Sequence, residues 1–498
     1  MTETVKFEKS PAEQQLYLAH VWRKRGKIDA AIASYQKVID LQPNYTEAHL
    51  QFGEFLLETG RETDAIAVYQ RAMELNPDEA TFYQQVLDNF LKPAPIINES
   101  SAPPIDNIKG HILLYTDCPE IYGAAQLNHA LMCGLVGAAY KVTSVQAEAS
   151  HYLISQRNQL GIQHIWLEPD NIYNPLKPAN AFTNTDEPKK IFTQAQPDLI
   201  IFGDGCPFSS LTAKEVAIEM GIPYIQLVHC VTSEWAKKFE DNLPRLPKIY
   251  QNAFSVITVS QENLNLLHQD FKLPENIGVV IYNGKAASYF NPQNIQIRDR
   301  IRQELNIPLD GVVCLTTARL DPVKGYQYQL SAIQQLQNSD IWSKLYFIWA
   351  GGGNLTLLLK NLSSEMGISK QIKFVGERSD IPNLLDAADI FILPSQYEGM
   401  PLAIMEAMAK GKPVIASTVS GIPEELGDTG KLLPDPKIDS GATIQELANT
   451  IQEWAANPEL RNTVGKACKN RAEKLFKEER MLEDYIEIIE QTLSNLSK

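Results

Sequence analysis

The sequence predicts an α/β protein of two Rossmann-like domains, preceded by an all-α module of helical repeats. Three observations support this fold class. The chain has 498 residues, which is more than one hydrophobic core usually holds. Its N-terminal part repeats itself with a fixed period. The remainder alternates short apolar runs with helix-like stretches, as parallel strands do when helices cover both faces of their sheet.

The repeat indicates pairs of short helices. Small residues at matching positions allow close packing, tyrosines fill the interface, and a proline ends each unit. The positions that match at the shift of the repeat are Gly26 and Gly60, Ala31 and Ala65, Ile32 and Ile66, Tyr35 and Tyr69, Leu41 and Leu75, and Pro43 and Pro77. The pattern resembles the tetratricopeptide repeat (TPR), with Ala19 and Gly53 at its small position. We expect TPR helices over residues 1–91, with 79–91 as a closing helix.

Two TPR units expose much apolar surface, so we expect them to pack onto the next domain. The module is either a structural appendage or dimerisation element, or a groove for a peptide or partner protein, and the sequence leaves both open. Residues 92–109 are rich in proline and polar residues, which predicts a linker.

Two series of strands follow the linker. They predict one Rossmann-like domain at 110–290 and another at 291–498, the latter including C-terminal helices, with a hinge at 283–302. Ligands in such folds bind at the carboxyl ends of the strands. The expected strands are His111–Tyr115, Asp198–Phe202, Tyr224–His229, Val256–Val259 and Val279–Tyr282 in the first domain, and Val312–Thr316, Leu345–Ala350, Ile372–Val375, Ile390–Leu393 and Pro413–Ala416 in the second.

The most informative segment is 395–417, which follows a predicted strand and opens a helix. Pro401 suits a first helical turn, and Gly399 allows close approach of the backbone. Free N–H groups at such a helix start attract a phosphate or a sugar hydroxyl. Glu398 stands just before the helix and Glu406 within it, and a carboxylate can accept two hydrogen bonds from a vicinal diol such as ribose.

This E-G-x-P-L-x-x-x-E string resembles the E-x7-E signature of glycosyltransferase family 4, whose members have the GT-B fold and retain the anomeric configuration. The resemblance extends over about residues 110–480. It implies that Glu398 holds the donor sugar and that Glu406 holds the ribose. Further contacts with the donor are implied for the segment Gly399, Met400, Pro401 and Leu402.

Other segments resemble the same family. Arg319 and Lys324 stand in a T-A-R-L-D-P-V-K-G string that is similar to its G-R-L-x-x-x-K-G element, which implies that both cations bind the diphosphate. Fixed positive donors are the groups that such a leaving group needs. Gly352 and Gly376 end strands where the family has glycines, and we expect backbone roles for them.

The first Rossmann-like domain carries two further similarities. Gly123 lies where the family has a glycine-rich loop, but Ala124 follows it in place of a second glycine. His229 ends a strand as the histidine of the family's V-H-D element does, which implies a contact with the donor sugar. Cys230 replaces the aspartate of that element.

The resemblance implies a metal-independent, retaining glycosyltransferase that needs no cofactor and uses a nucleotide sugar, such as a UDP- or GDP-sugar, as its donor substrate. The acceptor (a glycan, a lipid or a protein) remains open, as do the base, the sugar and the linkage. The alternatives are a TPR scaffold with an inactive GT-B part, a TPR-guided protein glycosyltransferase, and an epimerase acting on a nucleotide sugar. Ala124 and Cys230, which depart from the family's pattern, are the residues that favour the inactive scaffold.

Composition sets limits on partners and location. A formal net charge of -15 argues against a nonspecific nucleic-acid binder, because such binding depends on neutralising phosphates. The cysteines are scattered, and no apolar run approaches the roughly 18 residues of a membrane span, so we expect a cytoplasmic protein. Peripheral membrane association is the alternative. It would use the cluster of Trp235, Lys237, Lys238, Phe239, Arg245 and Lys248, which we expect to be a solvated surface segment.

Overall fold

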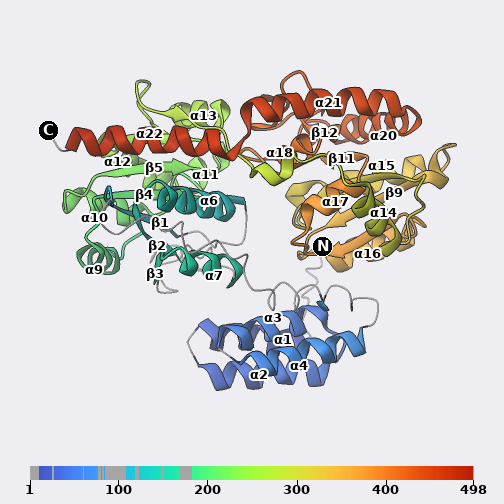
Figure 1. The fold of residues 1–498 in the computed structure, drawn as a ribbon, viewed down its shortest axis with the longest axis horizontal. Helices are drawn as coiled ribbons and strands as arrows, with labels where there is room; N and C mark the ends of the chain where they lie inside the picture. The colour runs from blue at the N-terminus through green and yellow to red at the C-terminus, as the bar shows by residue number, and fades with distance from the viewer. Residues whose placement is uncertain are drawn as a thin grey trace, which may run out of the picture. The chain divides into compact units, whose positions relative to one another are not determined.

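A computed structural model describes two compact units, one formed mainly by residues 1–99 and the other by most of the chain from residue 100 onward (Figure 1). The residues described are 11–24, 27–59, 61–76, 80, 83–84, 108–117, 123–146, 151–167 and 182–496.

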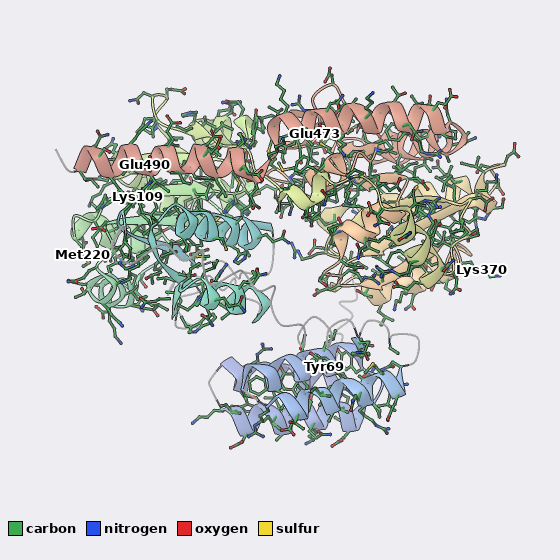
Figure 2. The ribbon with its side chains drawn as sticks, in the orientation of Figure 1. Tyr69, Lys109, Met220, Lys370, Glu473 and Glu490 are labelled. Carbon is green, nitrogen blue, oxygen red and sulfur yellow. The ribbon has the colours of Figure 1, made fainter. Side chains whose placement is uncertain are left out.

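The N-terminal unit consists of helix pairs, as the repeat predicts. Helix α1 packs against α2, and α3 packs against α4. The repeated residues Ala31, Ala65, Tyr35 and Tyr69 are all fully buried, which confirms that the matching positions form the interior. The ring of Tyr69, labelled in Figure 2, occupies the space beside Gly53. The helices are α1 (Pro11–Lys24), α2 (Ile28–Leu41), α3 (Thr46–Glu58) and α4 (Glu62–Leu75).

Several predicted features of this region fall outside the described residues. They are the turn positions Gly26 and Gly60, the proline at Pro77, and nearly all of the closing helix at 79–91 and of the linker at 92–109.

The second unit contains two parallel sheets, and the first lobe is built on the first of them. Its strand order is β3-β2-β1-β4-β5-β6-β7, and the central strands are buried along their whole length because helices cover both faces. The strands are β1 (His111–Thr116), β2 (Lys141–Gln146), β3 (Gln163–Trp166), β4 (Leu199–Asp204), β5 (Tyr224–Val228), β6 (Ser255–Thr258) and β7 (Val279–Val280).

All five strands predicted for this lobe are confirmed. Strands β2 and β3 were not predicted, because their polar residues mask the apolar pattern. The helices of the lobe are α6 (Gly123–Gly137), α7 (His151–Gln159), α9 (Asp186–Ala195), α10 (Leu211–Glu219), α11 (Ser233–Lys238), η5 (Glu240–Arg245), α12 (Leu246–Asn252) and α13 (Gln261–Phe271).

The second lobe has the strand order β10-β9-β8-β11-β12-β13, again parallel. Its five predicted strands are confirmed, and the short edge strand β13 is additional. The strands are β8 (Val312–Thr317), β9 (Leu345–Ala350), β10 (Ile372–Gly376), β11 (Ile390–Leu393), β12 (Val414–Ser417) and β13 (Lys431–Leu433). The helices are α14 (Ile295–Glu304), η7 (Pro322–Lys324), α15 (Tyr326–Leu336), η8 (Trp342–Lys344), α16 (Thr356–Glu365), α17 (Ile381–Ala387), α18 (Leu402–Ala409), α19 (Ile422–Leu426), α20 (Ser440–Ala456) and α21 (Pro458–Leu475).

The last helix, α22 (Glu478–Leu496), returns to the first lobe and lies along α6 (Figure 1). An ion pair of 2.7 Å between Lys109 and Glu490 joins it to the start of β1 (Figure 2). The chain therefore crosses between the lobes twice, once near η6 (Ala287–Phe290) and once before α22. The two crossings meet where the backbone of Lys285 forms an isolated parallel β-bridge with the backbone of Lys477.

Within the part of the chain that the structure covers, no helix combines the length and the apolar character needed to cross a bilayer. Of the cationic-aromatic cluster, Arg245 pairs with Glu215 at 2.5 Å, and Trp235 packs against the core of the first lobe.

Replacing Gly53 with alanine should destabilise the N-terminal unit. The added Cβ would lie 2.3 Å from the Cζ atom of Tyr69. Overpacking of this kind costs on the order of 1 to 3 kcal/mol, against a gain in helix propensity of about 1 kcal/mol. Hydrogen exchange of the full chain should show faster exchange in α3 and α4. Gly137→Ala, whose Cβ meets no atom within 4 Å, is the matched control. Unchanged protection in Gly53→Ala would contradict the packing described.

Candidate active site

The segment between β11 and α18 places the first predicted residues at the carboxyl edge of the second sheet. Helix α18 begins after Pro401, and no side chain caps its first turn. The side chains of Met400 and Leu402 are buried, so this segment can offer a ligand mainly its backbone. An uncapped helix start presents N–H groups and the positive end of the helix dipole, which together favour an anion.

Glu398 and Lys324 form an ion pair beside this helix start. The Lys324 Nζ lies 2.7 Å from the Glu398 Oε1, and the side chains are 19% and 10% exposed. The Ser395 hydroxyl donates to the same carboxylate oxygen at 2.7 Å. Lys324 reaches this position because Asp321 caps the short helix η7 and Gly325 turns the chain at a positive φ of 77°. The structure thus brings together two residues that are 74 positions apart in the sequence.

Arg319 lies on the loop that leads from β8 to η7. Its side chain is 45% exposed, and its guanidinium is 3.7 Å from the carboxylate of Asp321. The loop is fixed by the predicted glycines, because the Leu320 amide donates to the Gly352 carbonyl at 2.7 Å and the Gly351 amide donates to that of Gly376 at 2.7 Å. The ends of β8, β9 and β10 are therefore joined by their backbones at one edge of the sheet.

Glu406 has a partner that sequence reasoning missed. Its Oε1 lies 2.7 Å from the Nζ of Lys285, in a pair whose side chains are 8% and 10% exposed. The Tyr289 hydroxyl also bonds to this carboxylate, and burial together with the Glu406 charge raises the pKa of Tyr289, so that the hydroxyl keeps its proton. Lys285 and Tyr289 come from the segment between the lobes. The only signal in the sequence was the position of Lys285 directly after Asn283 and Gly284.

The first lobe contributes His229, and its backbone touches the second lobe. A Cβ on Gly399 would lie 2.1 Å from the His229 carbonyl oxygen, so only glycine fits there. The His229 Nε2 lies 3.1 Å from the Asn128 Oδ1, and burial lowers the pKa of His229 to about 4. The imidazole is therefore neutral at pH 7 and can offer hydrogen bonds rather than charge.

Cys230 and Gly123 lie next to these contacts. Burial and the charge of Glu398 raise the pKa of the Cys230 thiol to about 12, so it stays protonated. Gly123 begins helix α6 and lies against the side chain of Leu402. A Cβ added at Gly123 would be 3.7 Å from the Leu402 Cδ1 atom. The four residues of the predicted loop that precede it, 119–122, lie outside the described part of the chain.

Two further contacts join the lobes, one just before α18 and one at α19, and were not predicted. The Asn283 side-chain amide donates to the Met400 carbonyl at 3.1 Å. The Glu424 carboxylate accepts from the Gln261 amide at 2.8 Å, at the start of α13. Neither Asn283 nor Glu424 was among the predicted site residues.

Among the described side chains, no group of three or more histidines, cysteines, aspartates or glutamates could hold a metal ion. Lys324 and Lys285 bring positive charge to α18 through their ion pairs with Glu398 and Glu406, and Arg319 lies on the loop that leads to Lys324. The chemistry that fits such a place is recognition of an anion together with a polyhydroxylated group, because cations, N–H groups and carboxylates stand side by side.

Comparison with known families assigns the two modules. Residues 297–471 match the family described as Glycosyl transferases group 1, and residues 23–87 match the Tetratricopeptide repeat. The chain therefore carries a group 1 glycosyltransferase domain and an N-terminal TPR region, as the sequence motifs predict.

Individual relatives match part of the chain. The D-inositol 3-phosphate glycosyltransferase of Corynebacterium efficiens is 33% identical over 210 residues, which are 40% of this chain and 49% of the relative. The UDP-Gal:alpha-D-GlcNAc-diphosphoundecaprenol alpha-1,3-galactosyltransferase of Escherichia coli is 36% identical over 143 residues, or 28% of this chain and 37% of the relative. The chain spans about half the length, or less, of these two relatives.

Solved structures share the fold. Anabaena HepE in complex with UDP and glucose superposes with a TM-score of 0.63 and 20% identity, over 76% of this chain and 99% of HepE. The sucrose-phosphate synthase of Thermosynechococcus elongatus gives 0.61 and 22%, over 77% of this chain and 99% of the synthase. The predicted GT-B fold is confirmed.

Glu425, next to the site, should make stability depend on pH. Its side chain is fully buried. Burial and the nearby charge of Glu398 raise its pKa well above the usual value. A raised pKa contributes stability that is complete below the pKa of the unfolded chain and is lost as the pH rises toward the folded value.

We therefore expect Glu425→Gln to gain stability relative to the wild type as the pH rises from 5 to 8, by up to about 1.4 kcal/mol per pH unit. Thermal or urea unfolding across this range measures the difference. Glu453→Gln, at an exposed position, should show no such trend. A constant difference between wild type and Glu425→Gln would show that Glu425 is ionised in the folded protein.

Proposed function

We propose that the protein transfers a sugar from a nucleoside diphosphate sugar to an acceptor, with retention of the anomeric configuration and without a metal ion. The observation that carries the proposal is the Lys324–Glu398 pair beside the uncapped start of α18, with Glu406 in the same helix. The match of residues 297–471 to the group 1 glycosyltransferases supports the class of reaction.

In this proposal the donor diphosphate binds at the start of α18, next to Lys324 and Arg319. The N–H groups and the two cations balance the charge that develops as the diphosphate leaves. Each such donor typically contributes about 10²- to 10³-fold in rate. The Glu398 carboxylate, already held by Lys324 and Ser395, accepts hydrogen bonds from sugar hydroxyls. Glu406 accepts from the ribose diol.

In this proposal the first lobe binds the acceptor, and the contact between His229 of that lobe and Gly399 of the second lobe holds it beside the reacting sugar. A neutral imidazole can bond to a sugar hydroxyl without competing for the diphosphate. Retention follows if the acceptor oxygen bonds to the anomeric carbon on the face from which the diphosphate departs, while the leaving phosphate oxygen takes the acceptor proton. The acceptor itself is a glycan, a lipid or a protein.

A donor panel tests the proposal. Purified protein is mixed with UDP-, GDP- and ADP-sugars, and the thermal shift and the slow hydrolysis of each donor are measured. UDP-galactose belongs in the panel because the name of the E. coli relative contains it. We expect one donor to raise the melting temperature. No response to any donor would contradict the proposal and favour a scaffold function.

Lys324→Ala should lower the rate of donor hydrolysis by roughly 10²- to 10³-fold and weaken the thermal shift, because a fixed cation at the diphosphate is lost. Lys370→Ala is the matched control, since Lys370 is an exposed lysine of the same lobe (Figure 2). Equal loss in both variants would mean that Lys324 acts only through overall charge.

Activity should survive a chelator. Lys324, Arg319 and the start of α18 supply positive charge from the protein itself, so we expect the same hydrolysis rate with and without excess EDTA. The measurement is repeated after adding Mn²⁺ or Mg²⁺. Loss of activity in EDTA that either ion restores would exclude a metal-independent reaction.

A further inference from the structure

Lys285 is a tightly held cation near α18 that the proposed donor contacts do not use. Its backbone is fixed on both sides by the second crossing of the chain, because its amide donates to the Phe476 carbonyl at 2.9 Å and its carbonyl accepts from the Glu478 amide at 3.0 Å. Its side chain is 10% exposed. Such a lysine has little freedom to leave its partners.

The side chain joins three elements. The Nζ lies 2.7 Å from the Glu406 Oε1 on α18, 3.4 Å from the Gln126 Oε1 on α6, and 4.7 Å from the centre of the Tyr289 ring. Glu406 belongs to the second lobe and Gln126 to the first. Lys285 therefore connects the carboxylate to the helix that starts at Gly123.

Burying a carboxylate to the extent seen for Glu406 is costly unless a partner compensates its desolvation. Lys285 supplies this compensation through one oxygen, Oε1. An ionised carboxylate has about four acceptor positions on its two oxygens, so others remain for a ligand. Without the lysine the carboxylate would lose the contact that fixes its orientation, and it would be a poorer acceptor for two adjacent hydroxyls.

We propose that Lys285 is a positioning residue that holds the Glu406 carboxylate toward the two hydroxyls of a ribose, and that it determines the preference of the site for ribonucleotides. The inference rests on the proposed function, in which Glu406 receives the ribose of the donor. Lys285 itself acts through Glu406 and does not touch the sugar.

Binding of nucleotides with and without the ribose hydroxyls tests this role. Dissociation constants are measured by calorimetry for UDP, GDP and ADP, each beside its 2′,3′-dideoxy counterpart. In the wild type we expect the ribonucleotide that binds to do so roughly 10²- to 10⁴-fold more tightly than its dideoxy form, because two hydrogen bonds to a charged group are lost. In Lys285→Met we expect this ratio to fall below about 3.

Three further variants separate positioning from a merely structural effect. Lys285→Arg keeps the charge and should keep most of the preference. Lys477→Met removes an exposed lysine beside the same crossing and should leave the ratio unchanged. Glu406→Gln should abolish the preference by itself, and adding Lys285→Met to it should cause no further change. If Lys285→Met does not fold, Lys285→Gln takes its place.

The outcomes distinguish this inference from the proposed function. If the wild type binds no nucleotide, both are overturned. If it binds one but ignores the ribose hydroxyls, the inference and the role of Glu406 are wrong, while a diphosphate site remains. If the preference persists in both Lys285→Met and Lys285→Gln, only the inference is overturned.

Discussion

The contact between Gly399 and the His229 carbonyl sets the geometry of the whole site. A side chain at position 399 would place its Cβ 2.1 Å from that oxygen, so the two lobes meet backbone to backbone. Because α18 starts directly after this contact, its uncapped first turn faces the junction of the lobes. Arg319, Gly352 and Gly376 lie at or just after the ends of β8, β9 and β10, at the carboxyl edge of the same parallel sheet.

Two lysine–glutamate pairs flank α18, one at Glu398 and one at Glu406. A buried carboxylate without a partner is costly, so each pair allows an acidic side chain to stay close to α18. The pairs differ in origin. Lys324 belongs to the same lobe as its partner, whereas Lys285 comes from the segment between the lobes. The second pair therefore depends on how the two lobes are placed relative to each other, whereas the first pair does not.

The C-terminal helix explains why the segment between the lobes is well fixed. Helix α22 leaves the second lobe, crosses beside Lys285 and packs on α6, where Leu482 fills the space next to Gly134. The two crossings support each other through backbone hydrogen bonds on either side of Lys285. A change in the angle between the lobes would have to bend both crossings together. The Lys109–Glu490 pair ties the far part of the helix to the first lobe.

The sequence by itself determined the fold class, ten of the thirteen strands found in the described ranges, and the local pattern around Glu398 and Glu406. Continuous apolar runs and glycine–proline spacing reflect short-range physics, which a sequence pattern can show. It missed β2, β3 and β13, whose polar or short segments lack that signal. Only the tertiary structure decided that Lys285 pairs with Glu406, that Ser395 and Lys324 share Glu398, and that Glu425 is buried. These contacts join residues from separate loops, and their energies depend on burial and distance, which no local pattern encodes.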